Sequence, residues 1–204
     1  MQELVKQITK TTMIDHKTNR IFIKLAVFAC FFYSSTSTSK EQRSINYAHH
    51  MQQLVNIAQN SAAKTPFAAM IVDSKSGEIL CIDTNPGTYS PIDHGEIEAI
   101  RNCSDKYQDK MRWRNTTLIS TAEPCPMCQG AISWANISTV VYGTSIPYLI
   151  ENGWRQLNLR AYEIASRSTF NRTKIIGGVL ADQTDRLFDR RSKKENKHNA
   201  HQTH

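Results

Sequence analysis

The chain has 204 residues, enough for one domain whose hydrophobic core needs no disulfide support. Apolar residues make up 40% and charged residues 21%, fractions that are ordinary for a soluble globular protein. The net charge of +7 lies at the ends: residues 1–40 hold six basic and two acidic side chains, residues 189–204 hold five and two, and residues 41–188 hold fourteen of each. The neutral central part lacks the bulk positive charge typical of nucleic-acid-binding proteins, so nucleic acid is not expected as the main partner.

The N-terminal residues have the layout of a secretory signal. Lys17, Arg20 and Lys24 precede the apolar run 25–33, which a stretch of serine and threonine follows. Nine apolar residues are too few to span a bilayer. We therefore expect residues 1–39 to be a signal or targeting segment, and the mature protein to be periplasmic or secreted, with no transmembrane span. A cytoplasmic protein with a partly buried N-terminal helix is the alternative. Residues 191–204 are expected to form a basic, disordered tail.

Between these ends, hydrophobic periodicity and turn residues predict a domain over residues 40–190. The predicted elements are a helix from 45 to 58, a hairpin of strands 67–72 and 78–83, a loop over 85–93, a helix over 94–102, a strand over 116–121, a helix over 126–135, a strand over 139–143, a loop containing Pro147 and Gly153, a helix over 159–166, a strand over 174–180 and a helix over 182–190. An N-terminal helix, a β-hairpin and following βα units predict an α/β fold with a three-layer α/β/α sheet.

The cysteines fall into two groups besides Cys30 of the targeting segment. Cys81 and Cys103 lie in apolar or amphipathic stretches and are expected to be small buried thiols. A disulfide between them, in an oxidising compartment, is the alternative. Cys125 and Cys128 form a spaced pair that could be a redox motif or half of a structural zinc site. The chain has no second pair for a closed tetrathiolate site, and this pair follows the third predicted strand rather than the first.

A metal site with an open position explains this pair better. Cys125 and Cys128 are three residues apart at the start of a helix, so both sulfurs should project to one side, where the helix N-terminus favours thiolates. His94 opens another predicted helix and can supply a nitrogen. Three protein ligands leave the fourth tetrahedral position of Zn²⁺ to water, as in catalytic zinc sites.

Glu96 lies two residues after His94 and should reach the open position rather than the metal. There it could take a proton from the water and pass it to the substrate, with a contribution on the order of 10²–10⁴ in rate. A solvated acid at a helix start is the alternative for Glu96. Asp93 and Glu98 are expected to be surface groups or neighbours of the site.

His94-Gly95-Glu96 followed by Pro124-Cys125-Pro126-Met127-Cys128 resembles the signature of the zinc-dependent deaminases. The chain is similar to the cytidine deaminase superfamily, in particular to the branch of guanine deaminases and tRNA adenosine deaminases, from about residue 46 to residue 190. The resemblance implies a cytidine deaminase-like fold, Zn²⁺ as cofactor and a homodimer. It also implies that backbone groups near Phe67 and Ala69, together with Asn85, hold the base. The alternative for Asn85 is a structural role as a polar turn residue.

We therefore expect hydrolytic deamination of a nucleobase or nucleoside, with guanine or another purine favoured, and release of ammonia. Gly153-Trp154-Arg155-Gln156 resembles deaminases of free bases or nucleosides, and Trp154 could stack on a base or pack. Tyr148 and Tyr162 are further candidates for base contacts. A tRNA adenosine deaminase and a non-catalytic, zinc-stabilised binding module are the alternatives.

Overall fold

The computed structural model describes residues 45–63, 65–87 and 90–190. The expected targeting segment 1–39 and the basic tail 191–204 lie outside these residues. None of the helices in the described ranges has the length and apolar character needed to cross a membrane.

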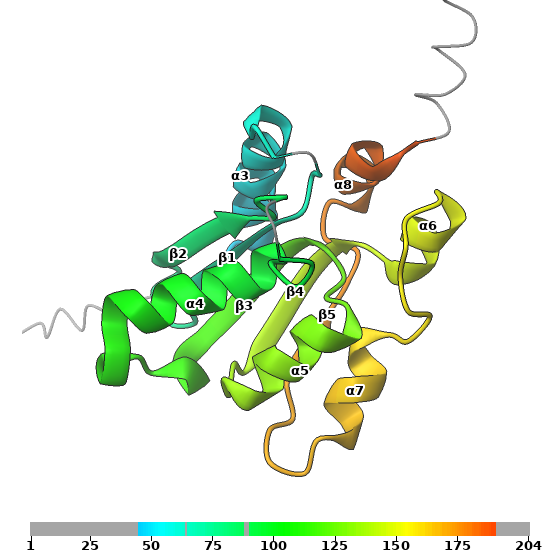
Figure 1. Ribbon diagram of the computed structural model, residues 1–204. Helices are drawn as coiled ribbons and strands as arrows, with labels where there is room; N and C mark the ends of the chain where they lie inside the picture. Colours follow the sequence, from blue (N-terminus) through cyan, green and yellow to red (C-terminus); the bar gives the residue numbers. More distant parts are fainter. Residues whose placement is uncertain (1–44, 64, 88–89, 191–204) are drawn as a thin grey trace, which may run out of the picture. The chain divides into compact units, whose positions relative to one another are not determined.

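A five-stranded mixed sheet forms the centre of the fold, in the order β2-β1-β3-β4-β5 (Figure 1). Its strands are β1 (Ala68–Asp73), β2 (Ile79–Thr84), β3 (Thr116–Ala122), β4 (Thr139–Thr144) and β5 (Lys174–Ile176). β1 pairs antiparallel with both β2 and β3, whereas β3, β4 and β5 are parallel. The expected hairpin is confirmed, and the parallel strands bring the segments that follow β3 and β4 to one edge of the sheet.

Helices cover both faces of this sheet (Figure 1). They are α3 (Tyr47–Asn60), α4 (Gly95–Tyr107), α5 (Pro126–Trp134), α6 (Ile146–Glu151), α7 (Ala161–Arg167) and α8 (Ala181–Phe188), with short 3₁₀ turns η2 (Gln108–Lys110) and η3 (Trp113–Asn115). On β1, Met70 and Val72 join the core cluster of α3, α6 and α8, and Ala69 and Ile71 join the cluster of α4 and α5. Because successive side chains of a strand point to opposite faces, one apolar strand supports two cores. The expected three-layer α/β/α fold is confirmed.

The prediction of a loop around Pro147 was wrong, because α6 begins there. Pro147 occupies the first turn of α6, where a missing N–H breaks no helical hydrogen bond. Ser145 is the N-cap residue, and its Oγ accepts the N–H of Tyr148 at 3.3 Å. Pro147 therefore lies in the first turn of a helix rather than in a loop.

The closing strand is shorter than predicted. β5 ends at Ile176 rather than at residue 180. Gly178 and Leu180 have positive φ angles, +79° and +52°, in the left-handed region that a continuous strand cannot contain. The apolar run 174–180 thus combines a short strand with the turn that leads into α8.

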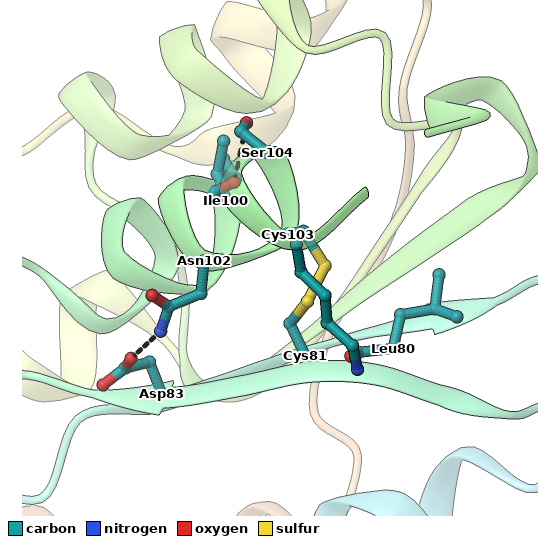
Figure 2. The surroundings of a disulfide bond; sticks show 8 residues. Leu80, Cys81, Asp83, Ile100, Asn102, Cys103 and Ser104 are labelled. Carbon is teal, nitrogen blue, oxygen red and sulfur yellow. Dashed lines mark hydrogen bonds between the residues drawn. A yellow bond between two sulfur atoms is a disulfide. The ribbon is translucent and has the colours of Figure 1, made fainter. Parts of the chain in front are cut away.

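Cys81 of β2 and Cys103 of α4 form a disulfide (Figure 2), so the expectation of free buried thiols was wrong. The alternative of a bridge is confirmed. Lys106 Nζ adds a hydrogen bond to the carbonyl of Leu80 at 3.1 Å, and the Asn102 amide donates to Asp83. α4 is therefore fastened to the edge strand, which matters because α4 also carries His94 and Glu96 at its start.

Candidate metal centre and active site

Two helix N-termini on one face of the sheet carry the predicted metal ligands. His94 is the N-cap residue of α4, and Cys125 is the N-cap residue of α5, each with extended backbone. Cys128 lies in the first turn of α5. The unpaired N–H groups and the positive dipole end of a helix favour negative charge at these positions.

The three side chains converge on one point. The Sγ atoms of Cys125 and Cys128 are 3.5 Å apart, and His94 Nδ1 lies 3.6 Å from the first and 3.5 Å from the second. A tetrahedral zinc with Zn–S of about 2.3 Å and Zn–N of about 2.0 Å holds its ligand atoms roughly 3.5–3.8 Å apart. His94, Cys125 and Cys128 are the group that could hold a metal ion in the described part of the chain. With three protein donors, this arrangement leaves a tetrahedral position for another ligand.

The two thiols share a proton. Because Cys128 hydrogen-bonds to the Cys125 sulfur and His94 adds a second hydrogen bond, the pKa of Cys125 falls to about 4, although burial opposes the change. The same hydrogen bond to Cys125, together with burial, raises the pKa of Cys128. Hydrogen bonding to Cys125 also raises the pKa of His94. An incoming metal ion would find one thiolate ready and displace the remaining protons.

Glu96 lies beside this group and outside it. It is only 4% exposed, and its Oε1 accepts a long hydrogen bond of 3.4 Å from Ser120 Oγ on β3. Burial, followed by the charge of Cys125, raises the pKa of Glu96. Burial excludes the alternative of a solvated helix-start acid. A buried carboxylate with a raised pKa is suited to accept and return a proton.

Gly95 lies between the proposed ligand and the carboxylate, where α4 starts beside β1. A Cβ at this position would lie 3.4 Å from the Phe67 carbonyl oxygen and 3.5 Å from the Ala69 nitrogen, at ordinary contact distance. The start of α4 is thus packed closely against the start of β1.

A cavity of about 240 Å³ opens next to His94. Its wall consists of Thr65, Phe67, Asn85, His94, Trp154, Arg155, Gln156 and Arg190. Phe67 and Asn85 are thus brought to His94, as expected for base contacts. Ala69 is not among the lining residues, because its side chain is fully buried in the core beneath α4.

Asn85 also has the turn role that was its alternative. Its Oδ1 accepts the N–H of Gly87 at 2.9 Å, and its own N–H donates to the Phe67 carbonyl at 2.9 Å. The second bond fixes the loop after β2 against the start of β1. Asn85 therefore lines the cavity while its side-chain oxygen accepts the hydrogen bond from Gly87.

Trp154 packs as part of the cavity wall. Its Nε1 donates to the Phe188 carbonyl at 2.8 Å, and its ring meets Phe67 and Phe188 edge-on at 5.2 and 5.6 Å. The Arg190 guanidinium lies over the ring, 3.4 Å from its centroid. These contacts favour the packing interpretation over base stacking.

The other candidates lie away from the cavity wall. Tyr162 is half exposed beneath Arg160, and Tyr148 packs against the core of α3 and α8. Glu98 forms an ion pair of 2.6 Å with Arg101, whose guanidinium also lies 3.6 Å from Asp93. Sequence reasoning gave no role to Glu123, a buried carboxylate two residues before Cys125. Its place in the cysteine motif was the available signal.

Replacing Trp154 tests the packing role. We expect Trp154→Ala to lower the free energy of unfolding by about 2–4 kcal/mol, because the ring contacts with Phe67, Phe188 and Arg190 are lost. Trp154→Phe should cost only about 1 kcal/mol, for the lost hydrogen bond. Urea denaturation measures both values. An unchanged unfolding free energy in Trp154→Ala would contradict packing as the role of this ring.

Comparisons with known proteins place this geometry in a family. The model of the cytidine and deoxycytidylate deaminase zinc-binding region matches residues 44–144. The tRNA-specific adenosine deaminase of Streptococcus pyogenes serotype M18 is 37% identical over 99 residues, which cover 48% of this chain and 62% of that protein. The guanine deaminase of Bacillus subtilis is 33% identical over 115 residues, 54% of this chain and 72% of that protein.

The fold has a counterpart among solved structures. The guanine deaminase from Nitrosomonas europaea superimposes with a TM-score of 0.59 and 24% identity, over 69% of this chain and 81% of that one. This chain spans about three fifths of the streptococcal relative's length. The matching zinc-binding region and the similarity to most of the Bacillus enzyme show that the chain belongs to the cytidine and deoxycytidylate deaminase family.

Proposed function

We propose that this protein is a zinc-dependent hydrolytic deaminase of a nucleobase or nucleoside, with guanine or another purine favoured. One observation carries the proposal. His94 Nδ1 and the sulfurs of Cys125 and Cys128 are spaced as zinc ligands, beside the buried carboxylate of Glu96 and a cavity of about 240 Å³. The donor set of one imidazole and two thiols suits Zn²⁺.

In this proposal His94, Cys125 and Cys128 hold the zinc. Bound zinc would supply Lewis acidity that lowers the pKa of a water to about 7. Glu96 takes a proton from the attacking water and delivers it to the ring nitrogen. It then moves a proton to the departing amino group, which leaves as ammonia. Its burial keeps the carboxylate close to these atoms and away from bulk solvent.

The cavity wall is the proposed base-binding surface. Phe67 offers an apolar ring, and Asn85 an amide, next to His94. Backbone groups of the first strand, including those of Ala69, are carried over from the family resemblance as further contacts. The similarity to most of the Bacillus guanine deaminase favours a purine base.

A tRNA adenosine deaminase is the second candidate, supported by the 37% identity to the streptococcal enzyme. The balanced charge of residues 41–188 counts against it, since fourteen basic and fourteen acidic side chains give no bulk attraction to RNA. A binding module without activity would have no need of a buried acid such as Glu96.

An ammonia-release assay on zinc-loaded protein tests the function and separates these candidates. The substrates are free purines and pyrimidines, their nucleosides and nucleotides, and an anticodon stem-loop RNA. We expect release from a free purine base or its nucleoside. Release from the stem-loop alone, with binding that weakens steeply as salt increases, would instead support the tRNA enzyme.

Paired substitutions test the roles of the site residues. We expect Glu96→Gln to keep one zinc per chain and to lose on the order of 10²–10⁴ in kcat, since the proton carrier is lost. Cys128→Ser should lose the zinc itself. Metal content by mass spectrometry and ammonia release measure the two effects.

Glu98→Gln is the matched control for this experiment, because it changes a neighbouring carboxylate of the same helix that pairs with Arg101. It should keep both zinc and activity. Equal ammonia release from Glu96→Gln and the wild type would favour the binding-module alternative.

We also propose that the protein is exported. The support is the signal-like layout of residues 17–39 and the disulfide between Cys81 and Cys103, a bond typical of oxidising compartments. N-terminal sequencing of material from the native host should find a start beyond the apolar run. An intact N-terminus at Met1, or at Met13 if translation starts there, with free thiols at the two cysteines, would contradict export.

A homodimer is proposed from the family resemblance, with the exposed surface of α5 as support. Trp134 is 77% exposed, and its ring contacts the tilted ring of half-exposed Phe170 at 4.8 Å between centroids. Exposed aromatic residues of this kind are typical of protein interfaces. Sedimentation should give a dimer for the wild type and a monomer for Trp134→Glu. A monomeric wild type at micromolar concentration would overturn the proposal.

A further inference from the structure

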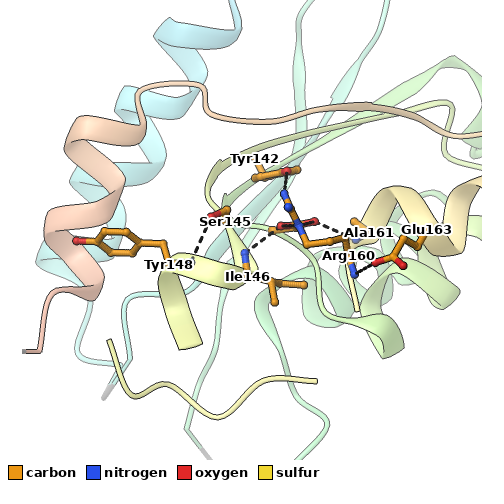
Figure 3. Close-up of polar contacts among 8 residues, drawn as sticks. Tyr142, Ser145, Ile146, Tyr148, Arg160, Ala161 and Glu163 are labelled. Atoms are coloured by element: carbon orange, nitrogen blue, oxygen red, sulfur yellow. Dashed lines mark hydrogen bonds and ion pairs between the residues drawn. The ribbon is translucent and has the colours of Figure 1, made fainter. Parts of the chain in front are cut away.

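Glu123 is a buried carboxylate at the end of β3. Its side chain is fully buried, and Arg160 Nε donates to its two oxygens at 2.9 and 2.7 Å. The N–H of Ile146 donates to Oε2 at 2.9 Å, and the N–H of Ala161 donates to Oε1 at 2.9 Å. Figure 3 shows Ile146, at the start of α6, and the adjacent Arg160 and Ala161, at the start of α7, lying close together. One carboxylate thus binds an arginine and two backbone N–H groups.

Those two N–H groups belong to the first residues of α6 and α7, which have no acceptor inside their own helices. Negative charge at a helix N-terminus is favourable, so one carboxylate stabilises both helix starts. Ile146 and Ala161 are also the two ends of a single stretch of chain. Glu123 therefore closes residues 146–161 into a loop held at both ends.

This stretch contains much of the cavity wall. Trp154, Arg155 and Gln156 lie within it and face the cavity beside His94. The main chain of Glu123 belongs to the sheet, where its N–H donates to the Thr144 carbonyl at 2.7 Å, and Cys125 follows two residues later. Glu123 thereby connects the cavity wall to the segment that carries the proposed metal ligands.

The arginine of this pair is held from a second side. Arg160 Nη2 donates to the Tyr142 hydroxyl of β4 at 2.9 Å (Figure 3). Gly177 lets the Tyr142 ring lie there, because a Cβ at that position would overlap the ring. The guanidinium is thus bound to the carboxylate and to the sheet, which fixes its orientation.

We propose that Glu123 and Arg160 are positioning residues that hold the cavity wall 146–161 in register with the proposed metal ligands. The inference rests on the proposed function for its kinetic consequence and on the contacts of Glu123 for its structural one. Cys125 is anchored through the sheet, whereas residues 146–161 are anchored at both ends through the carboxylate. Loss of the carboxylate should therefore displace the cavity wall formed by residues 146–161 and leave the proposed metal ligands in place.

The test compares Glu123→Gln with Arg160→Lys in the full chain. Glutamine keeps the size of the side chain but brings an NH₂ donor against N–H donors. The contacts that hold the two ends of residues 146–161 are therefore lost. Zinc content should stay at the wild-type value, while kcat/KM falls roughly 10–100-fold through a higher KM, since small misplacements at a site cost this much. Arg160→Lys keeps the positive charge and should show an intermediate KM.

Ile137→Ala is the control for simple destabilisation, because Ile137 precedes β4 and is buried in the core cluster of α4 and α5, which contains no residue of 146–161. It should lower the unfolding temperature and leave KM unchanged. Equal KM values for zinc-loaded Glu123→Gln and the wild type, with lower stability only, would overturn the proposal.

Hydrogen exchange separates this proposal from the proposed function, because it needs no activity. In Glu123→Gln, amides of residues 146–161 should exchange at least about tenfold faster, as expected for local opening, while those of α5 are unchanged. The control should show no such localised change. An increase in exchange rate of the same size across the whole chain would refute the positioning role of Glu123, whether or not the protein deaminates any substrate.

Discussion

The site depends on the approach of one imidazole nitrogen to two thiol sulfurs at the starts of α4 and α5. The sheet order, the start of α4 and a disulfide make this approach possible. The sheet order places β1 beside β3, so the segments that follow β2 and β3 reach the same edge, and α4 begins in close contact with the start of β1 at Gly95. The Cys81–Cys103 disulfide then ties α4 to the edge strand. Each of these features acts on the position of a helix, and the ligand geometry follows from the helix positions.

The two helix N-termini that carry the metal group also create its electrostatics. Proton sharing between Cys125 and Cys128 leaves one sulfur as thiolate even without an ion, and burial holds Glu96 ready to accept a proton. A buried charge is unfavourable unless it is paired, so such a group needs a nearby cation or proton. Glu123 meets the same demand with an arginine and two N–H groups. The two buried carboxylates thus differ in their partners. Glu123 has a full set of hydrogen-bond donors, whereas Glu96 is poorly paired.

Much of this arrangement could be predicted from local pattern. Spacing of three residues after Pro124 put both cysteines at a helix start, and the layers followed from alternating helices and strands. The errors have local causes too. The loop predicted around Pro147 is partly helix α6, because the first turn of a helix tolerates proline. The apolar run from Lys174 predicted a longer strand, although Leu180 is left-handed. That backbone groups near Ala69 hold the base stays a prediction, and the side chain of Ala69 fills the core, since strand neighbours face opposite sides.

By itself, the sequence determined the chemical groups of the site: an imidazole, two thiols and a carboxylate. It also determined the secondary structure around each group, through helix-start and strand signals that act over a few residues. Tertiary structure decided which distant groups meet. The bond between Cys81 and Cys103, the four hydrogen bonds on Glu123 and the packing of Trp154 against Phe188 join segments 22 to 38 residues apart. Local propensity carries no information about such pairings, because they arise only when the sheet order brings the segments together.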